Sequence, residues 1–243
     1  MCQSSKQEMR KSLLVILTVV FCGCEAELPD YFRSSSVLYD FTLSQYEWSG
    51  DFADYPEGDS VFYELEVAYE LLPDAVNSAG DRMGILVTGN NHSDDLFMFL
   101  RKEVNDLKPN TTYEIFYIVT LASNAPTGSI GIGGSPGESV YLKAGATSQQ
   151  PMKILDNGSY IMNLDKGNQA TGGDDMIVLG NIANGTSSDT YKEITRSNDT
   201  TKPFSATTDS NGNLWLVVGT DSGFEGTTSI YFTKVRVYFN ELD

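Results

Sequence analysis

The clearest pattern of apolar positions along the chain lies at residues 110–122, NTTYEIFYIVTLA. Apolar side chains occupy every second position from Tyr113 to Leu121, and Phe116 and Ile118 stand at the alternate positions. Side chains alternate between the two faces of a strand, and β-branched and aromatic residues favour strands. A helix would show a polar stripe at a period of 3.6 residues, and none is present. The pattern therefore predicts a central strand that can bury side chains on both faces.

Eleven further segments show alternating or continuous apolar residues, with turn-forming residues between them. They are residues 37–43, 61–71, 83–88, 96–104, 139–143, 159–164, 175–179, 190–195, 204–208, 214–219 and 229–239. Leu96–Val104 also fits a short helix because its apolar residues are contiguous, but its two phenylalanines and its neighbours favour a strand. About twelve strands without a helix predict an all-β protein, either a sandwich or a barrel.

One connection between strands is specified by its own residues. Asn211-Gly212 supplies the two positive φ angles of a tight turn, so residues 209–213 predict a hairpin. The same residues resemble part of a calcium loop, but the glycine is misplaced and the terminal Glu is missing. A hairpin turn is therefore the favoured interpretation.

The composition limits what the protein can bind. The 33 acidic and 16 basic residues give a formal net charge of −17. Such a surface repels phosphate backbones and anionic bilayers, so we expect no nucleic-acid partner. A 40% hydrophobic content is enough for one large core, and no linker or repeat divides the chain after residue 36. We expect a single domain over residues 37–243.

The first residues have the composition of an export signal. Lys6, Arg10 and Lys11 precede the apolar run SLLVILTVVF at residues 12–21. A basic segment followed by an apolar run of this length is typical of a signal peptide, and the run is too short to span a membrane as a helix. All three cysteines lie within the first 24 residues, which excludes a disulfide framework or a zinc–thiolate site in the remainder.

Phe21-Cys22-Gly23-Cys24, directly after the apolar run, resembles the lipobox of bacterial lipoproteins. Gly23 and Cys24 match that pattern, whereas Phe21 replaces the usual Leu and Cys22 the usual small residue. The resemblance implies cleavage after residue 23, a lipid on Cys24, a tether at residues 24–36 and a place in the cell envelope, at the outer membrane. The membrane would then be contacted only through the lipid. An ordinary cleavable signal with incidental cysteines is the alternative.

A second resemblance concerns the fold. Leu107-Lys108-Pro109-Asn110-Thr111-Thr112-Tyr113 leads into the central strand and is similar to phrases that enter core strands of carbohydrate-binding-module-like jelly rolls. The closing segment 229–239 has the same look. The resemblance implies an antiparallel β-sandwich of jelly-roll type, and it assigns no ligand residue.

Strand direction predicts which connections meet. Consecutive antiparallel strands reverse, so their connections alternate between the two ends of a sandwich. Counting through the twelve strands places six connections at one end, which are residues 44–60, 89–95, 123–138, 165–174, 196–203 and 220–228. Loops at one end of a rigid scaffold often carry binding sites. We therefore expect Trp48, His92, Asp165 and Asp221 to lie on a common rim.

The polar residues of these loops suit a glycan. Asp165-Lys166-Gly167-Asn168-Gln169 combines a charge pair with two amides, which can exchange hydrogen bonds with sugar hydroxyls, and an aromatic side chain can cover the sugar ring. The predicted ligand-binding residues are Trp48, Tyr55, Asn91, His92, Asp165, Lys166, Asn168 and Gln169. For each loop the alternative is that Asp, Asn and Gly simply form turns.

The same loops contain carboxylates that could bind calcium, because calcium prefers oxygen ligands. The candidate metal ligands are Asp174, Asp221 and Glu225, with Asp165 close in sequence. Three functions remain open at this point. The first is a lipid-anchored envelope protein that binds a ligand, expected to be a glycan. The second is an envelope hydrolase that uses loop carboxylates, and the third is a structural or adhesive surface protein without a small-molecule site.

Overall fold

The computed structural model describes residues 35–198 and 204–242, and fifteen strands make up the fold of that part. The strands are β1 (Ser35–Asp40), β2 (Ser49–Ala53), β3 (Tyr55–Pro56), β4 (Glu66–Leu71), β5 (Met83–Asn90), β6 (Leu96–Val104), β7 (Thr112–Ser123), β8 (Val140–Thr147), β9 (Lys153–Asp156), β10 (Ser159–Met162), β11 (Met176–Asn181), β12 (Lys192–Ser197), β13 (Phe204–Thr207), β14 (Leu214–Ser222) and β15 (Thr227–Glu241). Apart from one short 3-10 turn at Asp74–Val76, these residues form no helix. No helix of this part is long and apolar enough to cross a membrane. The predicted all-β fold is confirmed.

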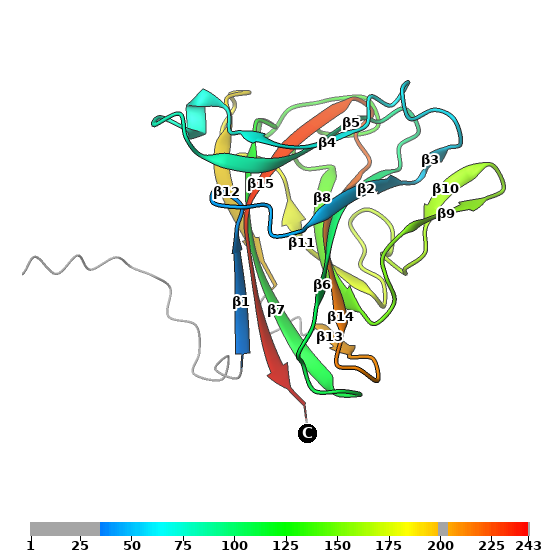
Figure 1. Ribbon diagram of the computed structural model, residues 1–243. Helices are drawn as coiled ribbons and strands as arrows, with labels where there is room; N and C mark the ends of the chain where they lie inside the picture. The colour runs from blue at the N-terminus through cyan, green and yellow to red at the C-terminus, as the bar shows by residue number, and fades with distance from the viewer. Residues whose placement is uncertain (1–34, 199–203, 243) are drawn as a thin grey trace, which may run out of the picture.

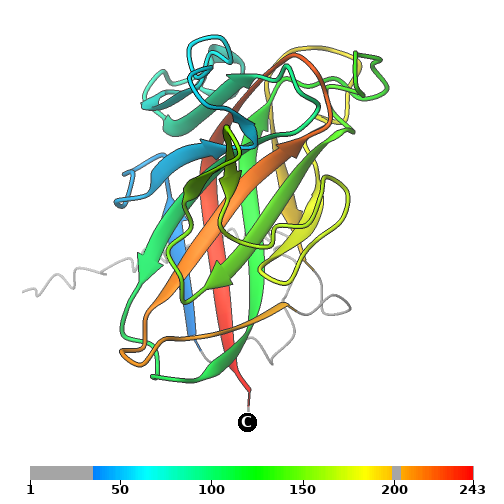
Figure 2. The ribbon, with the colours of Figure 1, turned by 90° about the vertical axis from the view of Figure 1, so that its right-hand side faces the viewer.

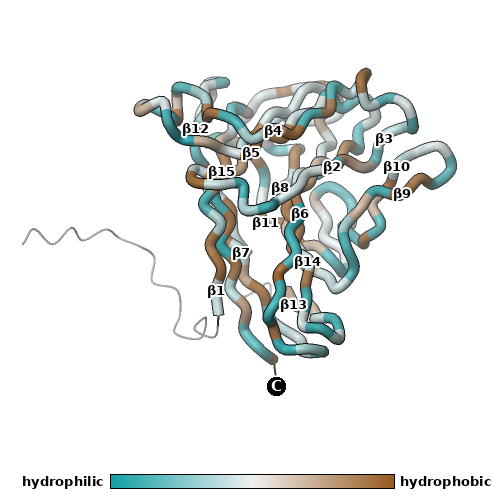
Figure 3. Tube along the Cα trace, viewed as in Figure 1, coloured by the Kyte–Doolittle hydropathy of each residue, from teal (hydrophilic) through white to brown (hydrophobic). Residues whose placement is uncertain are grey.

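Two antiparallel sheets face each other and form the sandwich (Figures 1 and 2). The first sheet has the order β12-β7-β15-β5-β4, with β1 also paired to β15 and β13 to β7. The second sheet has the order β11-β8-β14-β6-β2. A small third sheet of β3, β10 and β9 projects beside the second sheet (Figure 1). Apolar stretches run along β7, β6 and β14 (Figure 3), and alternate residues of both large sheets fill the core between them.

The central strand predicted at residues 112–122 is β7, which is paired along both of its edges. Its side chains of one parity, from Tyr113 to Leu121, are all buried between the sheets. The Tyr117 hydroxyl crosses the core and donates a hydrogen bond to the Gly145 carbonyl of β8 at 2.6 Å. On the outer face only Phe116 is buried in the run from Thr112 to Thr120, beside Tyr238 of β15. The second face of the strand is therefore only partly covered.

All twelve predicted strands exist, but the sequence interpretation missed three short ones, β2, β3 and β9. β9 places Ile154 and Leu155 in solvent, so it lacks the apolar alternation that identifies a half-buried strand. The first part of the segment predicted at 61–71 is a turn, and β4 begins only at Glu66. Ser35 and Ser36 of the predicted tether belong to β1, whereas the predicted signal peptide and Cys24 lie outside the described residues.

The connection 196–203, predicted at the rim, is not a reversal. β12 and β13 run in the same direction along one edge of β7, because Ser197 pairs with Ile118 and Phe204 with Ile115. The β9–β10 hairpin adds a reversal that the count omitted, and it brings residues 180–189 to the rim end, where Thr127 N–H donates to Thr186 O. These two errors offset each other, so the later connection 220–228 still lies where the count placed it.

The gap between β12 and β13 is filled by the side chain of Asn198, which is buried. Its Oδ1 accepts the Tyr117 N–H at 2.7 Å, and its Nδ2 donates to the Ile115 carbonyl at 3.0 Å. One amide side chain thus replaces the backbone partner that β7 lacks at this point.

Replacing Asn198 with alanine should leave a buried N–H and a buried C=O of β7 unpaired. Each such group costs about 1–3 kcal/mol, so the free energy of unfolding measured in urea should fall by about 2–4 kcal/mol. Asn168→Ala, in an exposed loop, is the control and should change it by less than about 0.5 kcal/mol. Equal stability of the two variants would contradict this role of Asn198.

Candidate ligand site at the loop rim

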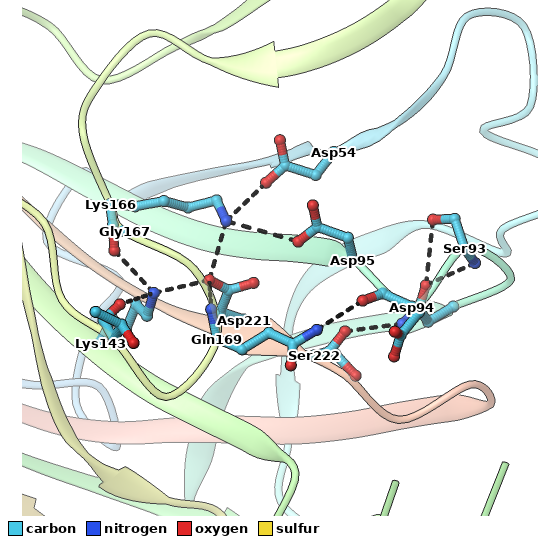
Figure 4. A network of polar contacts seen from close by, with 12 residues as sticks. Asp54, Ser93, Asp94, Asp95, Lys143, Lys166, Gly167, Gln169, Asp221 and Ser222 are labelled. Atoms are coloured by element: carbon cyan, nitrogen blue, oxygen red, sulfur yellow. Dashed lines mark hydrogen bonds and ion pairs between the residues drawn. The ribbon is translucent and has the colours of Figure 1, made fainter. Parts of the chain in front are cut away.

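Four segments that are distant in sequence meet at the end of the sandwich where β15 begins. Asn91 is buried, and its Nδ2 donates to the carbonyls of Ser222 at 2.9 Å and Phe224 at 3.0 Å. Ile132 forms a bridge with Glu225. The Gln169 side-chain Nε2 donates to the Asp94 carbonyl at 2.9 Å (Figure 4). We call the surface formed by residues 91–95, 130–134, 165–169 and 223–226 the rim.

Backbone conformations at the rim are set by contacts between the loops. Asp94 (φ 60°) and Gln169 (φ 43°) both have left-handed conformations, which are uncommon for residues other than glycine. Gly133 (φ 69°) fits between the Asp94 and Glu225 side chains, where a Cβ would lie 3.1 Å from an oxygen of the first and a carbon of the second. These loops therefore form one packed surface and are not independent turns.

A buried cluster of charges lies beneath the rim, on the outer face of the second sheet. Along β14 and β8, Leu142, Val218 and Thr220 point into the core, so Lys143 and Asp221 point the other way. The loop 163–175 covers this outer face. A second apolar cluster packs there, consisting of Ala53, Phe97, Phe99, Met162, Leu164, Met176 and Val217. The cover excludes water, and both charged side chains are 0% exposed.

Lys143 links the covering loop, residues 163–175, to the second sheet. Its ammonium donates to Asp221 Oδ2 at 2.8 Å and to the carbonyls of Lys166 at 2.8 Å and Thr171 at 3.0 Å (Figure 4). A lysine ammonium has three donors, so all of them are used. Burial lowers the pKa of Lys143, and the charge of Asp221 opposes this effect.

Lys166 reaches the same carboxylate from the covering loop. Its Nζ lies 2.9 Å from Asp221 Oδ2, 3.0 Å from Asp54 Oδ2 and 3.7 Å from Asp95 Oδ1, and 5.2 Å from the centre of the Phe97 ring. Burial alone would lower the pKa of Lys166, but the three carboxylates outweigh it and raise that pKa. Lys166 is thus an internal counter-ion, and the predicted contact of its ammonium with a ligand is not supported by its position.

Asp95 is the member of the cluster closest to solvent, with 49% of its side chain exposed. Burial of the rest raises its pKa to about 6, Lys166 opposes this effect, and Asp54 and Asp221 add to it. Burial also raises the pKa of Asp54, and Lys166 again opposes the change. The cluster therefore has one carboxyl that can change charge near neutral pH without leaving the fold.

An exposed aromatic surface lies beside the rim. The His92 ring stacks on Phe62, with ring centres 4.1 Å apart and an angle of 17° between the planes. The His92 Nε2 lies 3.2 Å from the Phe62 carbonyl, and Asn90 N–H donates to Tyr63 O, so the segments 60–64 and 90–92 are joined. Phe62 is 61% exposed. Sequence reasoning assigned Phe62 to a strand, although the preceding Gly58-Asp59-Ser60 is a turn signal that could have identified it.

Of the four residues expected on a common rim, only His92 and Asp165 belong to it, because Asp221 is buried beneath the rim and Trp48 lies elsewhere. Trp48 is buried in the core, with edge-on contacts to Tyr39 and Phe41, because its parity on the segment entering β2 points inward. Its ring face is covered, so the predicted role of Trp48 in ligand binding is wrong. Asp165 lies on the covering loop, where it accepts the N–H groups of Gly167 and Asp174, both at 3.0 Å. These hydrogen bonds lower the pKa of Asp165 and shape the loop.

The remaining predicted ligand residues divide into buried and accessible ones. Tyr55 is buried against Tyr63 and Tyr160, and its hydroxyl accepts a hydrogen bond from Lys153 at 3.0 Å. Asn91 is the buried clamp described above, so both have structural roles. His92, Asn168 and Gln169 reach the surface of the rim.

The predicted metal ligands do not come together. Asp221 is buried between two lysines, Glu225 lies in the bridge with Ile132, and Asp174 is exposed on the covering loop. Within residues 35–198 and 204–242, no three His, Cys, Asp or Glu side chains are grouped so that they could hold a metal ion. The set Asp174, Asp221 and Glu225 is therefore wrong as a single site, and calcium binding itself stays a prediction.

No protein-family model matches the sequence, and no curated protein matches it. The fold is similar to solved structures at low identity. One describes carbohydrate-binding modules of the β-sandwich superfamily, with 11% identity and a TM-score of 0.35; the match covers 82% of this chain and 58% of that one. A family 11 carbohydrate-binding module from Clostridium thermocellum matches at 12% identity and a TM-score of 0.34, covering 84% of this chain and 95% of that one. The K1 cleaved adhesin domain of Lys-gingipain from Porphyromonas gingivalis matches at 12% identity and a TM-score of 0.36, covering 84% and 97%.

Asp221→Asn should destabilise the protein strongly, because it leaves Lys143 buried without a counter-charge and removes one of the three carboxylates around Lys166. Breaking a buried ion pair on one side costs about 3–5 kcal/mol, which urea unfolding can measure. Asp174→Asn is the matched control on the exposed side of the same region, and we expect a change below about 0.5 kcal/mol. A loss below about 1 kcal/mol for Asp221→Asn would show that the cluster does not stabilise the fold.

Proposed function

We propose that this protein binds a glycan at the rim and is anchored to the cell envelope through a lipid on Cys24. The observation that carries the first part is the exposed stack of His92 on Phe62 beside the polar groups of three converging loops. The anchor rests on the lipobox-like residues 21–24.

The aromatic pair provides the apolar half of such a site. A sugar ring has apolar C–H faces that pack on aromatic rings, and 61% of Phe62 is exposed and accessible to such a ligand. His92 holds Phe62 in place through the ring stack and the contact of its Nε2 with the Phe62 carbonyl. A platform held in this way loses little conformational entropy when a ligand binds.

The polar half comes from carboxylate and amide groups. Asp94 and Glu225 flank Gly133, while Asn168 and Gln169 lie on the neighbouring covering loop. These groups can donate to and accept from sugar hydroxyls in pairs. The two lysines of this region are used in internal ion pairs, so the charged groups that remain at the rim surface are acidic. We therefore expect neutral glycans to bind in preference to those with uronic or sialic acids.

The position of the chain's entry supports display of the rim away from a membrane. Ser35 pairs with Phe239 near the end of β15, whereas the rim adjoins Thr227 at its start. Twelve residues of extended strand separate the two ends by about 40 Å. Figure 1 shows β1 entering and β15 ending at the pole opposite the loops. A lipid at Cys24 would hold the protein by that pole.

Removing the aromatic platform should weaken glycan binding. After a glycan array has identified a ligand, we expect Phe62→Ala and His92→Ala each to raise its Kd by about tenfold, which corresponds to about 1.4 kcal/mol. Isothermal titration calorimetry would measure the change. Ile154→Ala, which removes a 42% exposed side chain on β9, is the control and should bind normally. If no glycan binds, or both aromatic variants bind like the original protein, the proposal fails.

The anchor has a separate test. Cys24→Ser removes the thiol that would carry the lipid, so the protein should move from the membrane fraction to the soluble fraction when bacterial cells are broken. Cys22→Ser, two residues earlier, is the control and should remain in the membrane fraction. An unchanged distribution of Cys24→Ser would argue against lipidation at this residue.

A further inference from the structure

The buried charge cluster contains three carboxylate oxygens without a hydrogen-bond donor. Asp54 Oδ2, Asp95 Oδ1 and Asp221 Oδ1 are inaccessible to solvent and accept no hydrogen bond. Asp54 Oδ2 has the Lys166 ammonium at 3.0 Å, whereas Asp95 Oδ1 is 3.7 Å from it. The other oxygen of Asp221 is saturated, because it accepts from Lys143, Lys166 and the Gln169 N–H. Buried acceptors of this kind are rare and costly, so they call for a specific explanation.

The charges of the cluster point to one missing proton. Three carboxyl groups face two ammonium groups. Asp54 directly follows β2, Asp95 directly precedes β6, and Asp221 belongs to β14. Lys143 belongs to β8 and Lys166 to the covering loop. The Phe97 ring closes the remaining side without adding a charge. With every group ionised, the cluster has an excess of one negative charge. One proton makes it neutral and supplies a donor between Asp95 and Asp221.

The proton can lie between Asp95 and Asp221. Figure 4 shows both carboxyl groups directed at the same Lys166 ammonium. A hydroxyl on Asp95 would donate to Asp221, and a hydrogen bond between these side chains is one of the causes that raise the pKa of Asp95. Two carboxyl groups beside one ammonium ionise together only at a cost from like-charge repulsion.

This pair is connected directly to the rim. Gln169 is held at both ends, since its N–H donates to Asp221 Oδ2 at 3.0 Å and its Nε2 donates to the Asp94 carbonyl at 2.9 Å. Asp94 precedes Asp95, so any movement of Asp95 away from Asp221 also moves the acceptor of the Gln169 side chain. Asp94 and Gln169 both have left-handed backbones, which relax easily when their contacts are lost.

We propose that Asp95 and Asp221 share one proton, that this proton holds residues 91–95 and Gln169 in the closed arrangement of the rim, and that ligands consequently bind more tightly in mildly acidic than in neutral solution. The statement about ligands rests on the proposed glycan function. The shared proton and its effect on Gln169 do not. Loss of the proton places two negative charges side by side and loosens the 91–95 segment.

The direction of the pH effect follows from the pKa of Asp95. Burial raises this pKa to about 6, Lys166 opposes the rise, and Asp54 and Asp221 add to it. The folded protein therefore holds the proton more tightly than the unfolded chain, whose aspartates titrate near 3.9. The contribution to folding stability is complete below about pH 4 and is lost as the pH rises toward about 6.

The shared proton can be tested without a ligand. Carboxyl carbon resonances of the aspartates, followed by NMR from pH 3 to pH 8, should show one group with a midpoint near 6. That group should disappear in Asp95→Asn and remain in Asp94→Asn, which changes the adjacent carboxyl outside the cluster. The Gln169 side-chain amide protons should exchange with water at least about fivefold faster at pH 7.5 than at pH 5 in excess of the intrinsic pH effect, a change typical of coupled sites. Asp95 titrating near 4, or Gln169 exchange that follows the intrinsic rate, would overturn the proposal.

The second test of the proposal measures ligand binding. The Kd of the array-identified glycan should be about fivefold lower at pH 5 than at pH 7.5, and Asp95→Asn should remove the difference. All other rim side chains are intact in Asp95→Asn. A pH dependence that persists in that variant would assign the effect to another group and contradict the proposal. If no glycan binds at either pH, the proposed function fails, while the NMR titration still decides the shared proton.

Discussion

The burial of Lys143, Lys166 and Asp221 under the loop 163–175 is the constraint on which the functional end of this molecule depends. Charged groups on the outer face of a sheet normally remain in water, where they cost nothing to solvate. Here the loop covers them, so each donor and acceptor must find an internal partner. Lys143 satisfies this requirement with two carbonyls of the loop itself. The ion pair therefore determines where the loop lies, and the loop in turn places Gln169 against Asp94.

A purely apolar cover would hold such a loop less specifically. The cluster around Phe97, Phe99 and Met176 supplies contact area, but apolar contacts tolerate small shifts. Hydrogen bonds from one ammonium to three oxygens do not, because a displacement of 1 Å would leave a buried donor without its acceptor. The combination of both kinds of contact can explain how residues 165–169 form an ordered part of the rim although they contain no strand.

The fold was largely predictable because the patterns that specify most of its strands lie within short segments of the sequence. β7, β15 and β14 are recognisable from alternation and β-branched residues. The hairpin predicted at residues 209–213 is wrong, because β13 pairs with β7 in the first sheet and β14 with β6 and β8 in the second. The Asn211-Gly212 turn joins the two sheets, and of its two residues only Gly212 has a positive φ. The errors arose where a strand is stabilised by its neighbours and not by its own pattern. β9 shows its apolar residues to solvent, and the reversal expected between β12 and β13 is replaced by the single side chain of Asn198. Neither feature leaves a period in the sequence.

The site was predictable only in outline. Counting strand reversals brought His92, Gln169 and Asp221 to the same end, but a lysine or an aspartate in a loop reads the same whether it faces water or lies beneath a cover. Asp221 looked like a turn residue, although it is the last outward position of a buried strand. The prediction for Trp48 was wrong for the opposite reason. The neighbouring glycine and serine suggested a surface position, whereas the Trp48 ring is buried in the core.

Hydrogen–deuterium exchange of the backbone amides is the most direct test of the claim that the buried ion network orders the covering loop. The Gln169 amide donates to Asp221, the Gly173 amide to the Met176 carbonyl at the start of β11, and the Asp175 amide to the Asp165 carbonyl. We expect these three amides to exchange as slowly as those of β14, the strand that carries Asp221. Their hydrogen bonds can break only when the charge cluster opens. Exchange within seconds, as for an ordinary surface loop, would contradict the account.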